Sequence, residues 1–203
     1  MKIQSRQLEK AMDYLAYRKL IEVLLMEGKT TGQNQSSMLT DYTKLNVARM
    51  KRVDKTVEIL PGLQEFINLI DKPQTWIVIT EGWCGDAAQT VPLFNALAKL
   101  NDKINLQLVL RDENLELMDN YLTDGKSRSI PKLIVTRTEN LEEIFNWGPR
   151  PQALQKIFDE MRAADVPYAE RAEKLHAWYA KDKTVSTQKE ILEFFEARNS
   201  KTV

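Results

Sequence analysis

Apolar residues recur at helical spacing near the N-terminus, so the chain is expected to begin with two helices. Leu8, Met12 and Leu15 fall at positions i, i+4 and i+7, which indicates an amphipathic helix within residues 1–27. After a polar loop, a serine is expected to cap a second helix over residues 36–53. The faces of both helices that carry tyrosine and methionine are predicted to be core. On the second helix this face carries Met38, Tyr42 and Leu45.

From Lys55 onward, short apolar runs of strand type alternate with helical patterns. The predicted strands are 56–59, 76–80, 104–110, 133–136 and 143–146. The predicted helices between and after them are 61–71, 84–100, 113–122 and 152–164. Alternation of this kind predicts an α/β fold, in which a sheet of about five strands is flanked by helices. The last two strands are too close for a crossover connection and should pair antiparallel.

The pattern divides the chain into three segments. A helical extension over 1–54 and another over 166–203 are expected to flank an α/β domain over 55–165. In the last segment, Thr187 and Glu190 are expected to form a capping box for a final helix. Both extensions are expected to pack on the α/β domain, because isolated helices of this length are not stable and their apolar faces need burial.

The balance of charges and the absence of long apolar runs limit the classes of function that are expected. The 29 basic residues balance the 29 acidic residues, which gives no electrostatic basis for binding nucleic acid or an anionic membrane. The N-terminus lacks the apolar region of a signal peptide, and no apolar run approaches the roughly 20 residues that span a bilayer. A cytoplasmic protein is therefore expected. The single cysteine cannot form an internal disulfide, and the single histidine, His176, is expected on a helical tail away from the chemistry. No metal or cofactor is expected.

The cysteine lies where a strand should give way to a helix, in the segment Glu81-Gly82-Trp83-Cys84-Gly85-Asp86-Ala87. Backbone N–H groups and the helix dipole at such a position favour the thiolate, so the pKa of Cys84 is expected below about 8.5. Asp86 opposes this effect, or serves only as a partner of the helix dipole. The flanking helices are expected to leave this turn open. The alternative is an inert thiol in the core, since free cysteines are often buried.

Three features of this domain resemble the thioredoxin fold, beyond the order of its elements. Trp83-Cys84-Gly85 is similar to the thioredoxin active-site turn, and Pro92 lies where that family has a helix-kinking proline. The segment Arg128-Ser129-Ile130-Pro131 resembles the loop whose proline is cis and faces the active cysteine. The resemblance therefore implies a thioredoxin-like fold with a cis Ile130–Pro131 bond beside Cys84.

The whole chain also resembles a bacterial subfamily called only "thioredoxin family protein", which carries a Trp-Cys-Gly-Asp-Ala turn. The segments 41–46 and 111–118 share in this likeness. Two departures separate the chain from dithiol thioredoxins. Ala87 stands where the resolving cysteine would be, and Val78 stands where thioredoxins have a buried acid. A conventional protein-disulfide reductase is therefore not expected.

The resemblance and the turn together predict a monothiol protein that exchanges disulfides through Cys84, with an external thiol resolving the mixed disulfide. Its partner would be a protein or a low-molecular-weight thiol or disulfide. The expected substrate-binding residues are Trp83, Gly85, Asp86, Arg128, Ile130 and Pro131. Arg128 is alternatively a solvated loop charge. Two other functions remain open, a non-catalytic module that holds a peptide in the groove at Trp83 and Pro131, and a peroxide-sensing thiol.

Overall fold

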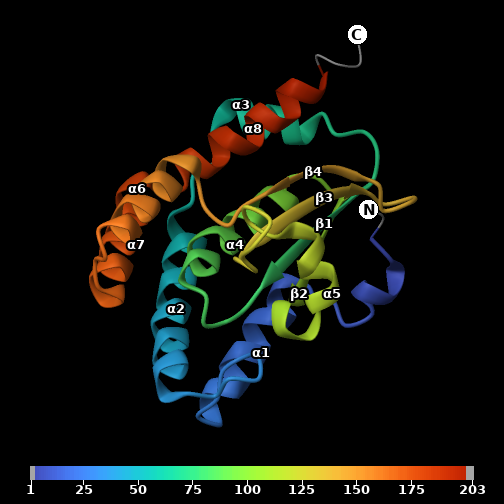
Figure 1. The fold of residues 1–203 in the computed structure, drawn as a ribbon. Coiled ribbons are helices and arrows are strands. Elements are labelled where there is room, and N and C mark those ends of the chain that lie inside the picture. The colour runs from blue at the N-terminus through green and yellow to red at the C-terminus, as the bar shows by residue number, and fades with distance from the viewer. Residues whose placement is uncertain (1–2, 200–203) are drawn as a thin grey trace.

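The computed structural model describes residues 3–199 and has helices around one small sheet (Figure 1). The strands are β1 (Gln74–Thr80), β2 (Ile104–Leu110), β3 (Lys132–Arg137) and β4 (Glu143–Trp147). The α-helices are α1 (Tyr14–Met26), α2 (Ser37–Thr56), α3 (Pro61–Asn68), α4 (Gly85–Ala98), α5 (Leu115–Met118), α6 (Gln152–Ala163), α7 (Tyr168–Asp182) and α8 (Val185–Asn199). Short 3₁₀ turns are η1 (Ser5–Leu8), η2 (Arg111–Glu113) and η3 (Asp119–Tyr121).

The sheet has the strand order β2-β1-β3-β4. β1 pairs parallel with β2 and antiparallel with β3, and β3 pairs antiparallel with β4, as predicted for the last two strands. Every residue of β1 after Gln74 is buried, which explains its continuous apolar run. The architecture confirms the predicted α/β fold with extra helices at both ends of the chain.

The predicted first strand, 56–59, does not form, and the sheet in residues 3–199 has four strands. α2 continues to Thr56, whose hydroxyl donates to the Arg52 carbonyl. The side chain of Gln188 on α8 then accepts from the Leu60 N–H and donates to the Glu58 carbonyl. Backbone groups that a strand would pair in a ladder are thus satisfied by a side chain, so a short β-prone stretch stays irregular.

The buried face of α2 also differs from the prediction. Met38 and Leu45 are 57% and 53% exposed, whereas the buried residues of the helix are largely polar. These are Thr40, Thr43, Asn46, Met50 and Val53. Thr43 pairs with the Thr30 hydroxyl at 2.5 Å. Hydrophobicity alone selected the wrong face because these polar groups are buried with hydrogen-bond partners.

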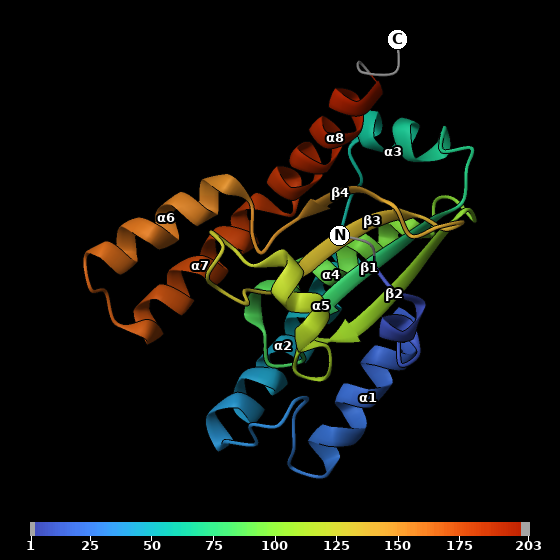
Figure 2. The same ribbon diagram turned by 45° about the vertical axis from the view of Figure 1, so that its right-hand side comes forward.

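The C-terminal helices are placed by polar contacts as well as by apolar ones. α8 begins at Val185, so Thr187 lies inside the helix and the predicted capping box is wrong. The Glu190 carboxylate instead accepts from the Trp147 indole N–H and the Gln152 backbone N–H, both at 2.7 Å. α6 and α7 lie side by side at the margin of the molecule, away from the sheet (Figures 1 and 2). No helix within residues 3–199 is both long and apolar enough to cross a membrane.

Candidate functional site

Cys84 joins the end of β1 to the start of α4. It is the N-cap of α4, with extended backbone angles, and its Sγ accepts a hydrogen bond from the Ala87 N–H at 3.5 Å. The prediction that this cysteine opens a helix is confirmed. Cysteine therefore occupies the position where serine, threonine or aspartate commonly satisfies a first-turn N–H group.

Two side chains from the N-terminal part of the chain fix the turn before the cysteine. The Thr31 hydroxyl accepts from the Gly82 N–H at 2.8 Å, and the Asn46 side-chain amide donates to the Gly82 carbonyl at 3.0 Å. A Cβ at position 82 would lie 3.1 Å from Ile21, so the turn also packs closely on α1. The N-terminal helices are thus part of the site's framework, a role that the sequence pattern did not reveal.

The loop before β3 lies against the thiol. The Ile130–Pro131 bond is cis, and the Cys84 thiol donates to the Ile130 carbonyl at 3.2 Å. Gly148 lies against this loop, because a Cβ there would lie 2.3 Å from the Pro131 carbonyl oxygen. The proline loop expected from the resemblance is therefore beside Cys84, with its carbonyl bonded to the sulfur.

The thiol itself is closed off from solvent. Cys84 is 7% exposed, and burial raises the pKa of its thiol to about 12. The charge of Asp86 raises this pKa further, while the Ala87 N–H and the Arg150 charge lower it. The expectation of a pKa below 8.5 is wrong, because desolvation of the thiolate outweighs the helix N-terminus. The turn is also less open than expected, because Cys84 itself is buried, whereas Trp83, Gly85 and Asp86 are partly exposed.

Asp86 is the centre of a buried ion pair rather than a simple first-turn dipole partner. Its Oδ2 lies 2.6 Å from the Arg150 guanidinium, and both side chains are only about a tenth exposed, at 12% and 11%. Its Oδ1 accepts from the Tyr179 hydroxyl at 2.8 Å. The Arg150 guanidinium also lies 4.0 Å from the ring centre of Phe158 on α6. Asp86 thereby joins the Cys84 turn to both α6 and α7.

His176, expected away from the chemistry, lies at the turn instead. A Cβ on Gly85 would be 2.7 Å from its ring. Arg52 donates to Gln89 Oε1 at 2.6 Å, so the Gln89 Nε2 faces His176 Nδ1, at 3.1 Å, as the donor. The ring proton of neutral His176 is then on Nε2. Burial and the charge of Arg49 lower the pKa of His176 to about 4, which keeps the ring neutral near pH 7.

The two remaining predicted site residues, Trp83 and Arg128, lie at the edge of the thiol site. Trp83 is half-buried beneath the guanidinium of Arg111, which is 4.7 Å from a ring centre of Trp83. Arg128 forms an ion pair with Asp119 at 2.6 Å, and both side chains are nearly half exposed, at 45% and 46%. The contacts of its guanidinium match those of a solvated loop charge.

A buried acid is present at a different place from that in dithiol thioredoxins. Val78 is fully buried and supplies no acid, whereas Glu81, three residues before the cysteine, is fully buried too. Glu81 Oε1 accepts from the Asp112 N–H at 2.9 Å, and burial raises the pKa of Glu81 to about 6. Glu81 was missed because its sequence position suggests an ordinary turn residue.

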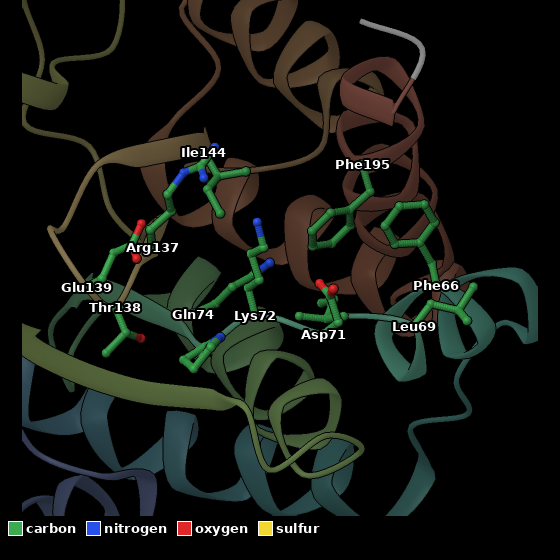
Figure 3. A pocket seen from close by; sticks show the side chains of 12 residues that line it. Phe66, Leu69, Asp71, Lys72, Gln74, Arg137, Thr138, Glu139, Ile144 and Phe195 are labelled. Atoms are coloured by element: carbon green, nitrogen blue, oxygen red, sulfur yellow. The ribbon is translucent and has the colours of Figure 1, made fainter. Parts of the chain in front are cut away.

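A cavity of about 830 Å³ lies at the other end of the sheet (Figure 3). It is lined by the first residue of β1, Gln74, by the last residue of β3, Arg137, and by the stacked rings of Phe66 and Phe195. Its lining contains neither Cys84 nor His176, so it is separate from the thiol site. Within residues 3–199, no cluster of three or more histidine, cysteine, aspartate or glutamate side chains could hold a metal ion.

The strand order, the Cys84 turn and the cis-proline loop define a thioredoxin-like α/β protein. A protein-family model described as thioredoxin matches residues 32–162, and the chain belongs to this family. A crystal structure of PA1234, a protein of unknown function from Pseudomonas aeruginosa, is similar with a TM-score of 0.63 and 15% identity, over 98% of this chain and 99% of that chain. An HIV epitope scaffold is similar with a TM-score of 0.62 and 14% identity, over 95% and 97%. No curated protein matches.

Proposed function

We propose that the chain takes part in thiol–disulfide exchange as a monothiol protein of the cytoplasm, with Cys84 as its reactive thiol. The observation that carries this proposal is the placement of the sulfur, which is the N-cap of α4 and bonds the carbonyl before a cis-proline. This is the arrangement that the thioredoxin resemblance predicts for a reactive cysteine. Membership of the family supports the fold, and the geometry of Cys84 supports the chemistry.

The exchange has two balanced steps. In the first step, the Cys84 thiol loses its proton to solvent, and the thiolate attacks one sulfur of a partner disulfide. The partner's S–S bond breaks, and its other sulfur leaves as a thiolate that takes a proton. An external thiolate then attacks the partner sulfur of the mixed disulfide and releases Cys84. Ala87 supplies no second thiol, so the external thiol, from a protein or a small molecule, is required.

The groove beside the cysteine would hold the partner. In this proposal Trp83, Gly85, Ile130 and Pro131 line the approach to the sulfur, and Arg128 lies on the rim. The Ile130 carbonyl bonds the thiol in the closed structure. A partner strand that pairs with this carbonyl would therefore replace the thiol as its donor and free the sulfur at the same time.

The burial of Cys84 favours a second candidate function. A thiol with a pKa of about 12 contains almost no thiolate near pH 7, and such a protein could hold a peptide or protein partner without turnover. In that case the groove at Trp83 and Pro131 would bind the partner, and the thiol would only maintain the turn.

A mixed-disulfide assay separates the two functions. The natural protein is incubated with a small disulfide and with a disulfide-bonded peptide, and intact mass is measured over time. Exchange predicts a covalent adduct on Cys84 that an external thiol removes, and Cys84→Ser should abolish it. The opposite outcome has two parts: the natural protein forms no adduct under native conditions, and Cys84→Ser binds the peptide as well as the natural protein does. Together these results support the binding module and contradict exchange.

A further inference from the structure

Side chains from the C-terminal part of the chain cover the two residues that open α4 after Cys84. The His176 ring on α7 lies against Gly85, and the Tyr179 hydroxyl bonds the carboxylate of Asp86. Gly85 and Asp86 are the two residues that follow the cysteine. α7 therefore lies over the first turn of α4, where a partner of Cys84 would have to approach.

α6 and α7 form a hairpin with its own interior. Their buried apolar residues pack on one another and make a cluster separate from the main core. The members of this cluster are Leu154, Met161, Leu175 and Tyr179, with Ile157, Phe158, Val166 and Trp178 packed against them. By contrast, Ile191 and Phe195 anchor α8 in the main core. The hairpin can therefore move as a unit and keep its own apolar contacts.

Besides the packing of the His176 ring on Gly85, an ion pair and hydrogen bonds tie this hairpin to the Cys84 turn and α4. Arg150, just before α6, and Tyr179 both bond Asp86, and His176 bonds Gln89. Polar contacts of this kind exchange for water at a small net cost, unlike the burial of an apolar core. At the other end of the hairpin, the connection from α7 to α8 passes through Lys183, whose φ of 51° is in the left-handed region.

We propose that the α6–α7 hairpin is a lid over Cys84, held closed by Asp86 and opened when the thiol reacts. Opening breaks the bonds of Asp86 and Gln89 to the hairpin and the ring contact of Tyr168 with Tyr42 on α2, and it leaves the main core intact. This inference concerns the regulation of the proposed exchange site and rests on that function. It explains how a thiol that is 7% exposed reaches a partner without unfolding of the domain.

The test compares two tyrosines in matched settings. Tyr179 is 3% exposed and donates to Asp86, which also pairs with Arg150. Tyr14, the first residue of α1, is 5% exposed; it donates to Asp54 on α2 at 2.9 Å and accepts from Arg18 at 2.8 Å. Tyr179→Phe removes a bond that holds the lid, whereas Tyr14→Phe removes a tyrosine–aspartate bond between α1 and α2, away from the lid. Both substitutions keep the ring.

The measurement is the rate at which an uncharged alkylating agent labels Cys84, followed against urea concentration below the unfolding transition. Lid opening exposes little surface, so the labelling rate should depend weakly on urea, whereas labelling through global unfolding should follow the full slope of unfolding. Tyr179→Phe should raise the rate about tenfold, the scale expected for losing a hydrogen bond to a charged group. Tyr14→Phe should leave it within about twofold.

Amide hydrogen exchange of the same proteins gives a second measure that needs no thiol. Exchange at the first turn of α4 should quicken in Tyr179→Phe, while β1 stays protected as in the natural protein. A labelling rate that follows only global unfolding, or equal effects of the two tyrosine variants, overturns the lid. Alkylation of Cys84 needs no disulfide, so it tests the lid separately from exchange. If the labelling results show an opening lid but the protein forms no mixed disulfide, the lid is supported and only the proposed exchange is refuted.

Discussion

The Sγ of Cys84 lies 3.2 Å from the carbonyl oxygen of Ile130, close enough for the thiol to donate a hydrogen bond. The same sulfur accepts from the Ala87 N–H at 3.5 Å. The first contact favours the thiol and the second favours the thiolate, so the balance between them depends on burial. In the closed structure burial favours the thiol.

The first prediction is that Cys84 titrates well above the ordinary range of cysteine. Since burial and Asp86 raise the pKa of Cys84 to about 12, alkylation measured against pH should have its midpoint above 8.5. Asp86→Asn should lower the midpoint, because it removes a nearby negative charge. Asp119→Asn, an exposed aspartate paired with Arg128, serves as the control and should leave it unchanged. A midpoint below 8.5 in the natural protein would contradict this account of the site.

The second prediction concerns the close approach of two backbone segments beside the thiol. Gly148 has a φ of 114°, and a Cβ there would lie 2.3 Å from the Pro131 carbonyl oxygen. Gly148→Ala should therefore lower the free energy of unfolding by more than about 3 kcal/mol, since both backbone strain and a clash with rigid backbone contribute.

Gly125→Ala is the matched control for this substitution. Gly125 also has a positive φ, of 65°, but a Cβ there would meet no atom within 4 Å. Its loss of stability should be limited to about 1 kcal/mol, the cost of the left-handed conformation alone. Urea unfolding of both variants measures the difference, and equal losses would show that the contact with Pro131 is not as close as described.

The third prediction concerns stability in acid. Burial lowers the pKa of His176 to about 4, so between pH 6.5 and 4 the unfolded chain binds a proton that the folded protein does not. The free energy of unfolding should fall as pH falls through this range. His176→Gln cannot titrate, and it should reduce the loss between pH 7 and pH 4 by about 1–3 kcal/mol.

Glu81 has the opposite effect in the same range and provides the control. Its pKa is raised to about 6, so the folded protein holds a proton between pH 6 and 4.5 that the unfolded chain releases. Glu81→Gln should therefore enlarge the loss of stability between pH 7 and pH 4. Urea unfolding of the three proteins at each pH measures both effects, and a change in the same direction for the two variants would refute the assignment.

The sequence predicted all four strands that form, and the start of the helix at Cys84, because their signals are local. The run 104–110 was predicted with the bounds that β2 has, and Cys84 was predicted at the start of a helix. The lid was not predictable, because it depends on contacts between distant residues. The sequence pattern predicts only that Tyr179 lies on the apolar face of a helix, whereas its hydroxyl donates to Asp86, 93 residues earlier in the chain. The polar buried face of α2 was missed for the same reason, since the partner of Asn46 is the Gly82 carbonyl.

The last prediction tests whether a missing second thiol separates this protein from dithiol thioredoxins. Ala87 follows Cys84 by three residues at the start of α4, and its N–H lies 3.5 Å from the sulfur. Residues at this spacing lie on one side of a helix, and their Cα separation fits the roughly 4.4–6.8 Å that a disulfide needs.

Ala87→Cys should form an internal disulfide and gain measurable reduction of a protein disulfide with a dithiol donor. The gain should be partial, because Val78 supplies no acid. Thr90→Cys, equally buried but six residues after Cys84 and therefore about 9 Å further along the helix axis, is the control and should keep two free thiols. Mass analysis after oxidation and blocking of free thiols distinguishes the variants, and two free thiols in Ala87→Cys would refute the thioredoxin-like arrangement of the turn.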